Sequence, residues 1–153
     1  MTEMGLDSAR PEGEKMTDMT RLLLQSSLGA ELSEEQAATL GELMQASRLV
    51  DGEYLISEGT ADDTLHVLLE GKLEVVKSAG GDDEASLAML RDGDLAGELS
   101  FIDGEAHTVG LRALTDSHVL SLKRGDFEGV ITEHPQLAYL VMRAVTRSAH
   151  KIV

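Results

Sequence analysis

The chain has 153 residues, the size of one ordinary domain, and a formal net charge of −15 that disfavours nucleic-acid phosphates and anionic lipid headgroups as partners. Aromatic residues make up 3%, so we expect an aliphatic core and no base-stacking surface, and the absence of Cys excludes disulfides and thiolate chemistry. No long apolar run or signal-peptide pattern is present, so we expect a soluble, cytoplasmic protein with no membrane or nucleic-acid partner.

The first part of the chain is expected to be a tail followed by helices. Residues 1–16 contain a proline, two glycines and no apolar period, which is typical of a disordered tail. From Met19 a short leucine-rich helix is expected to pack onto the domain. Ser33, with Gln36 three residues later, predicts a capping box at the start of a second helix.

After Met44 the apolar residues recur with the period of strands. Leu65–Leu69 and Leu73–Val75 alternate on the two sides of Gly71, which predicts adjoining strands and a hairpin turn at the glycine. Further strand candidates, in chain order, are Arg48–Val50, Tyr54–Ser57, Leu87–Leu90, Val109–Leu114 and His118–Leu122. Turn-prone Asp-Gly, Glu-Gly and Gly-Gly pairs separate them. We therefore predict a mainly β fold: an antiparallel β-roll or jelly roll of about eight short strands, with an N-terminal helix and C-terminal helices.

The chain is predicted to end in two helices. Asp126 is a candidate N-cap for the first, which Pro135 ends, and a longer helix follows from Gln136 to Ile152. Its apolar stripe is wide enough for core packing and for a two-fold seam, so we expect a homodimer through this helix. The stripe consists of Leu137, Leu140, Val141, Ala144 and Val145. We divide the chain into the tail (1–16), N-terminal helices with the roll (17–125), and C-terminal lid and dimerisation helices (126–153).

The glycines of the strand region carry a family resemblance. In the stretch VDGEYLISEGTADDTLHVLLEGKLEVV, five residues stand in a characteristic register: Gly52, Glu58, Gly59, Asp63 and Gly71. With the order of helices and strands, they resemble the cyclic-nucleotide-binding domain family from about Leu32 to about Ile152. The resemblance implies a β-roll that binds cAMP or cGMP and moves its C-terminal helices in response.

The stretch GDLAGELSFIDGEAHTVGLRAL is similar to the family's ligand-binding segment. There, Gly-Glu-Leu opens a short helix, the Glu accepts a hydrogen bond from a ribose hydroxyl, and an Arg about ten residues later pairs with the phosphate. The resemblance therefore implies a ligand site formed by Gly97, Glu98, Leu99, Ser100, His107 and Thr108. His107 stands where the family has its arginine.

The replacement of the arginine predicts weak binding. A guanidinium forks onto two phosphate oxygens, whereas an imidazole offers one donor and changes charge near neutral pH. Losing such a charge-assisted bond costs roughly 1.5–3 kcal/mol, which moves a micromolar site toward about 0.1 mM. Arg112 comes five residues later and is interpreted as a strand-surface residue. Glu98 could instead brace a turn, and His107 could be a surface histidine.

We therefore predict a stand-alone, non-enzymatic sensor module that binds a small anionic ligand weakly, if it binds one, and signals through its C-terminal helices. The chain ends before a helix-turn-helix could follow, so we expect no DNA binding. The alternative is a degenerate roll that acts in protein interaction or dimerisation without a nucleotide. No nucleophile–base set can be assembled from spacing. His66, His107 and His118 lack metal-ligand spacing, so we expect no metal site.

Overall fold

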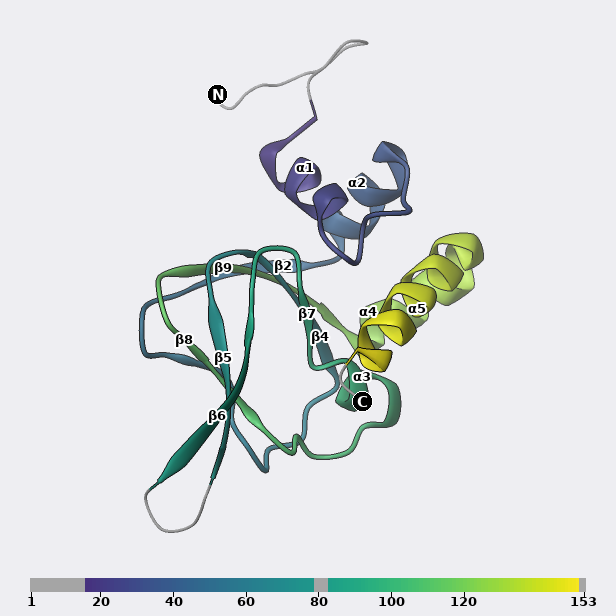
Figure 1. The fold of residues 1–153 in the computed structure, drawn as a ribbon. Coiled ribbons are helices and arrows are strands. Elements are labelled where there is room, and N and C mark those ends of the chain that lie inside the picture. Colours follow the sequence, from purple (N-terminus) through teal and green to yellow (C-terminus); the bar gives the residue numbers. More distant parts are fainter. Residues whose placement is uncertain (1–15, 79–82, 152–153) are drawn as a thin grey trace.

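The computed structural model describes residues 16–78 and 83–151 and contains five helices and eight strands in that part of the chain (Figure 1). The helices are α1 (Asp18–Gln25), α2 (Glu34–Glu42), α3 (Glu98–Asp103), α4 (Arg124–Glu133) and α5 (Pro135–His150). The strands are β2 (Gln45–Leu49), β3 (Tyr54–Ile56), β4 (Thr64–Glu70), β5 (Leu73–Ser78), β6 (Glu84–Leu90), β7 (Leu95–Ala96), β8 (Gly110–Ala113) and β9 (Ser117–Lys123). The expected tail falls almost entirely outside the described residues.

The strands form two antiparallel four-stranded sheets, in the orders β2-β9-β4-β7 and β3-β8-β5-β6. The helices α1 and α2 lie at one end of the roll, and α4 and α5 lie along one side (Figure 1). The predicted β-roll with flanking helices is confirmed. No helix in the described ranges is long and apolar enough to cross a membrane.

The turn at Gly71 is not the predicted hairpin. Strand β4 pairs with β7 and β9, whereas β5 pairs with β6 and β8, so Gly71 lies where the chain passes from one sheet to the other. Its φ is 131°, and a Cβ there would come within 2.2 Å of Ser117 Oγ. A glycine is therefore needed at this position, where it allows the chain to pass between the sheets and does not form a hairpin. Periodicity identifies strands and not their partners.

Two N-cap residues were predicted for the helices, and the structure confirms one of them. Ser33 Oγ accepts the Gln36 N–H at 3.0 Å and Gln36 Oε1 accepts the Ser33 N–H at 2.9 Å, so the predicted capping box is confirmed. The prediction that Asp126 caps α4 is wrong, because the N-cap is Lys123 in extended conformation. Asp126 lies in the first turn, where a carboxylate still interacts favourably with the helix dipole.

The mainly aliphatic core joins β4 and β9 to all five helices, and α3 contributes Phe101 to it. Phe101 packs edge-on against Phe127 with ring centroids 5.3 Å apart. In α5, Leu137, Val141 and Val145 are buried in this core, and Leu140 and Ala144 are partly buried against it. The stripe proposed as a dimer seam thus faces its own chain first, and the homodimer stays a prediction.

A carboxylate between α1 and α2 holds the last turns of α5. Glu31 pairs with Arg143 at 3.1 Å and with Arg147 through its other oxygen. These two cations lie one helical turn apart, so one carboxylate contacts both. The C-terminal helix is therefore tied to the N-terminal helices.

Candidate functional site

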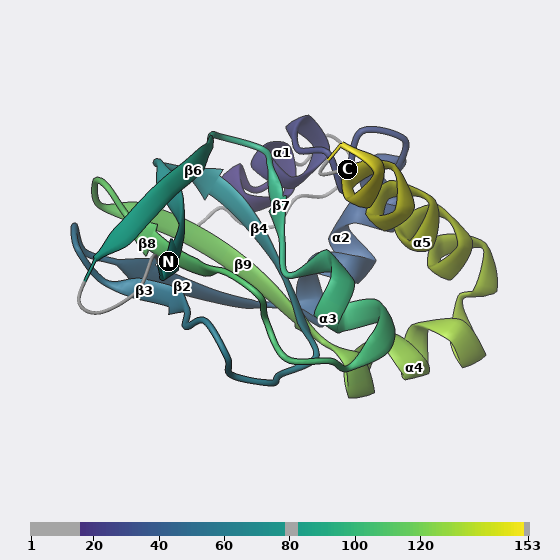
Figure 2. The same cartoon turned by 60° about the horizontal axis from the view of Figure 1, so that its bottom comes forward.

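Gly97 marks the start of the candidate site. Strand β7 leads into this glycine, which has φ 79° and is the N-cap of α3. A Cβ at Gly97 would lie 2.9 Å from the Thr64 carbonyl oxygen and 3.5 Å from the His66 ring. The close approach of β4 and the positive φ both require glycine here. Figure 2 shows the resulting position of α3, between β4 and β7 on one side and α4 and α5 on the other.

Glu98 is a buried carboxylate that contacts the C-terminal helix. It is 5% exposed, and Ser148 Oγ of α5 donates a hydrogen bond to Glu98 Oε2. Burial raises the pKa of the Glu98 carboxyl, and the Ser148 hydrogen bond opposes that rise. The side chain does more than brace its own turn, since it connects α3 to a residue fifty positions later.

Ser100 and His107 form a second buried pair. Ser100 Oγ donates to the Glu105 carbonyl at 2.7 Å and lies 3.1 Å from His107 Nδ1. The His107 backbone also pairs with the loop before β4, through its carbonyl with the Gly59 N–H and through its N–H with the Thr60 carbonyl, both at 2.8 Å. His107 is only 8% exposed, so it is not a surface histidine.

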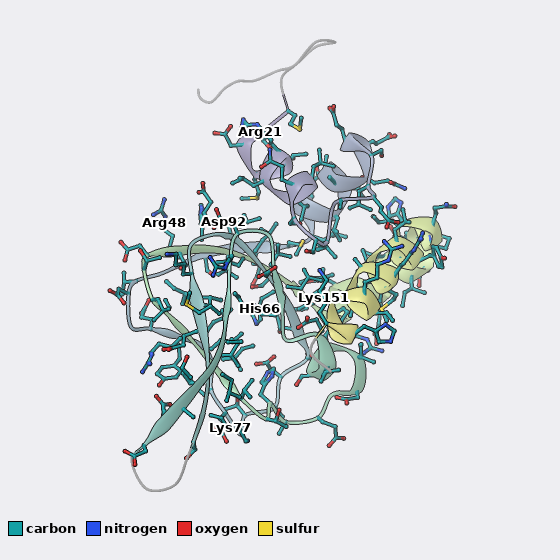
Figure 3. All side chains as sticks on the ribbon, in the orientation of Figure 1. Arg21, Arg48, His66, Lys77, Asp92 and Lys151 are labelled. Carbon is teal, nitrogen blue, oxygen red and sulfur yellow. The ribbon has the colours of Figure 1, made fainter. Side chains whose placement is uncertain are left out.

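Two further ionisable groups approach His107. Its Nε2 lies 3.3 Å from Asp62 Oδ1, in an orientation that leaves this buried nitrogen without a hydrogen-bond partner. His66 of β4, labelled in Figure 3, is 7% exposed and its Nδ1 lies 2.7 Å from Ser121 Oγ. Burial lowers the pKa of His66 to about 4; Asp62 opposes this shift and His107 adds to it. The site therefore holds two histidines near one aspartate.

Leu99 and Thr108 lie at the margin of the site. Leu99 is 53% exposed on α3, and Thr108 is exposed after His107. The Thr108 carbonyl accepts a hydrogen bond at 2.8 Å from Nζ of Lys77, which is labelled in Figure 3, and Lys77 also pairs with Glu58 at 3.3 Å. Of the six predicted residues, four lie within the site and two place their side chains toward solvent. Those within it are Gly97, Glu98, Ser100 and His107, and the exposed pair is Leu99 and Thr108.

Arg112 points away from the site, as its interpretation as a strand-surface residue predicts. Its guanidinium pairs with Glu74 at 2.7 Å and with Glu84 at 3.2 Å on the sheet of β3 and β8. It also lies 5.9 Å from the centre of the Tyr54 ring. The hydrogen bond from Arg112 lowers the pKa of the Glu74 carboxyl. Arg112 therefore does not replace the arginine missing at position 107.

Sequence reasoning missed the polar groups that reach the site from other elements. Ser148, Asp62 and His66 give no motif signal, because only the fold brings them to α3 and His107. Arg124 is a fourth such residue: its guanidinium donates to the Phe101 carbonyl at 2.6 Å and lies 5.8 Å from the Phe101 ring centre. It therefore ties the C-terminal end of α3 to the first turn of α4. In the described ranges no three His, Asp or Glu residues are arranged to hold a metal ion.

Comparison with known proteins decides the family. Residues 47–134 match the family model for the cyclic nucleotide-binding domain, which covers more than half of the chain and includes Gly97 to Thr108. The chain belongs to this family. The family is one of regulatory rather than catalytic domains.

Among family relatives, a CRP-like cAMP-activated global transcriptional regulator of Mycobacterium tuberculosis is 22% identical over 129 residues. The match covers 84% of this chain and 58% of the regulator, so the chain spans little more than half of that protein.

Two solved structures are similar in fold. The N-terminal domain of a transcriptional regulator from Streptomyces coelicolor A3(2) gives a TM-score of 0.74 at 34% identity, covering 86% of this chain and 94% of that one. The second is the regulatory subunit of a cAMP-independent protein kinase A from Trypanosoma brucei, a triple mutant bound to cAMP. It gives a TM-score of 0.72 at 22% identity, and the match covers 86% of this chain and 46% of that one.

Proposed function

We propose that this cyclic nucleotide-binding domain is a non-enzymatic regulatory module that binds cAMP or cGMP weakly and responds through α4 and α5. Its ligand site consists of Gly97, Glu98, Leu99, Ser100, His107 and Thr108. Family membership and the burial of Glu98, Ser100 and His107 around one short helix support this assignment. The homodimer through α5 is part of the same proposal.

The hydrogen bond between Ser148 and Glu98 carries the proposal. The family resemblance implies that the carboxylate at this position accepts a hydrogen bond from a ribose hydroxyl, and here one oxygen of that carboxylate accepts a hydrogen bond from the Ser148 hydroxyl of α5. A nucleotide whose ribose approaches Glu98 Oε2 would therefore compete with Ser148 for that oxygen. A ligand shifts a conformational equilibrium only when it interacts differently with the two states, and competition for one acceptor provides such a difference. Binding would loosen the last turns of α5 from the roll.

The residue at position 107 supports weak affinity. An imidazole supplies one hydrogen-bond donor toward a phosphate where the family arginine supplies a fork, so we propose a dissociation constant of about 0.1 mM or weaker. The trypanosomal regulatory subunit is a suggestive parallel. The protein kinase is described as independent of cAMP, and the mutant bound to cAMP carries a Thr-to-Arg substitution among its three.

The decisive experiment is calorimetry with cAMP, cGMP and a cyclic dinucleotide, on the wild type and on two serine or threonine variants of α5. Ser148→Ala leaves the buried Glu98 acceptor unpaired without ligand, so affinity should rise, by about one to two decades if roughly 1.5–3 kcal/mol of hydrogen bonding to this carboxylate is lost. Thr146→Ala is the matched control, since Thr146 is exposed two residues earlier on the same helix. A submicromolar constant for the wild type, or weaker binding by Ser148→Ala, would contradict the proposal.

One observation favours a second candidate function. Glu98 already has a partner within the chain, and position 107 offers no guanidinium, which is the combination expected of a domain used for protein interaction without a nucleotide. Such a module should show no heat with any of the three nucleotides at millimolar concentration. It should still associate through α5.

A further inference from the structure

We infer that Asp62 sets the ligand preference of the site, by competing with a ligand anion for the ring of His107. The inference rests on the proposed function, in which the phosphate approaches His107. It concerns a residue outside the predicted site and outside the family register, whose acidic position is Asp63. The geometry around the two ring nitrogens carries it.

The proton positions around Ser100 determine which nitrogen of His107 carries hydrogen. The single hydroxyl proton of Ser100 is donated to the Glu105 carbonyl, so Ser100 Oγ can only accept at His107 Nδ1. Nδ1 must therefore be protonated. In a neutral ring Nε2 then carries a lone pair, and it would face the Asp62 carboxylate, another acceptor, at 3.3 Å. A second ring proton turns this unfavourable pair of acceptors into an ion pair.

Backbone contacts keep Asp62 at this distance. The Thr64 N–H donates to Asp62 Oδ1 at 3.2 Å, and the same loop pairs with the His107 backbone through Gly59 and Thr60. The aspartate and the histidine are thus held by one loop.

The other charged groups around His107 do not offset Asp62. On β4, His66 is buried and its pKa of about 4 keeps it neutral above mildly acidic pH. On α3, Glu98 adds a carboxyl, with Asp94 near it. From β5, Lys77 reaches the Thr108 carbonyl but pairs with Glu58. Among the described groups, Asp62 is therefore the carboxylate closest to the nitrogen that would meet a phosphate.

A bound phosphate would share the His107 imidazolium with a like charge. Its oxygen at Nε2 would lie near Asp62 Oδ1, and the two anions repel each other. Asp62 therefore weakens binding of cyclic phosphates, while a ligand that places a neutral group there loses nothing. Removing the carboxylate should make the site more favourable to anions.

The first test is calorimetric titration of Asp62→Ala with cAMP at pH 5.5, below the ordinary pKa of an imidazole. We expect affinity to rise about three- to tenfold over wild type, as befits a half-exposed like charge a few ångströms away. Asp63→Ala removes the same charge from the neighbouring exposed position and should leave affinity unchanged. Equal effects of the two variants, or weaker binding by Asp62→Ala, would overturn the inference.

The second test needs no ligand. Nitrogen-15 NMR of the His107 ring, assigned with His107→Gln, reports which nitrogens carry protons. At pH 6 the signal of Nε2 should shift in Asp62→Ala relative to wild type and to Asp63→Ala, because the carboxylate 3.3 Å away is removed, and Asp62→Asn, which can keep the Thr64 contact, should resemble Asp62→Ala. An unchanged ring in both Asp62 variants would refute the pairing. A changed ring without any cAMP binding would instead refute the proposed function and leave the pairing intact.

Discussion

Mild acid is expected to destabilise the protein through His66. The side chain is 7% exposed on β4 beside Ser121, and burial lowers the pKa of His66 from 6.5 to about 4 because the charged ring loses its hydration. The unfolded chain keeps the ordinary value. Between these two values the unfolded state binds more protons than the folded state, so the free energy of unfolding falls as the pH falls.

The size of the effect follows from the two pKa values. One pKa unit corresponds to 1.36 kcal/mol, so the interval from 6.5 to about 4 amounts to about 3 kcal/mol once the pH is well below 4. The loss begins near pH 6.5 and should reach about 2 kcal/mol at pH 5. A loss of this size is a large fraction of the stability of an ordinary domain.

Urea denaturation of three proteins at pH 7, 6 and 5 measures this contribution. His66→Gln removes the titration and keeps a group that can hydrogen-bond to Ser121, so its stability should fall by about 2 kcal/mol less than that of wild type between pH 7 and 5. His134→Gln is the control, because His134 is exposed at the junction of α4 and α5 and should follow the wild type. If wild type and His66→Gln lose stability in parallel, the buried neutral ring is not the cause.

Four further outcomes are expected. Calorimetry should show cAMP affinity rising from pH 7.5 to pH 5.5, since only the imidazolium supplies charge, and this dependence should vanish in His107→Ala. His107→Arg should tighten binding by about one to two decades, and no gain would mean that the segment has diverged beyond this residue. Glu98→Gln should raise the free energy of unfolding at pH 7 in urea denaturation, because burial raises the pKa of this carboxyl and so disfavours its charged form; unchanged stability would contradict this. Analytical ultracentrifugation at on the order of 100 μM should show a dimer that Leu140→Glu dissociates, and a monomer there would refute the α5 seam.

The architecture was predictable because local signals agree with one another. Alternation on both sides of Gly71 and the capping box at Ser33 come from single segments, and both appear in the structure. Strand β7 was missed because two residues cannot show a period. The prediction of a hairpin at Gly71 was wrong because strand partners depend on contacts between residues distant in sequence. Here Ser117 packs directly against the glycine.

The candidate site likewise contains residues that local sequence predicts and residues that only the tertiary structure brings in. Gly97, Glu98 and His107 are found from one continuous segment and its register. Ser148 and Asp62 were not found, because their chemistry depends on where α5 and the loop before β4 are placed. Neither residue belongs to a sequence motif that would single it out. Buried hydroxyls and carboxylates acquire their partners in tertiary structure, where the choice of partner decides whether a ligand must compete.

The ties that hold α5 determine how strong a ligand needs to be. The helix meets two carboxylates, Glu98 through Ser148 and Glu31 through Arg143 and Arg147. A dissociation constant of about 0.1 mM corresponds to about 5.5 kcal/mol, whereas a hydrogen bond to a charged group contributes about 1.5–3 kcal/mol. The half-exposed pairs at Glu31 contribute about 0–1 kcal/mol each and weaken with salt. Even a weak ligand can therefore displace Ser148 from Glu98, and α5 would then remain attached through its buried apolar residues and through the tie at Glu31, of which the tie is the more sensitive to salt.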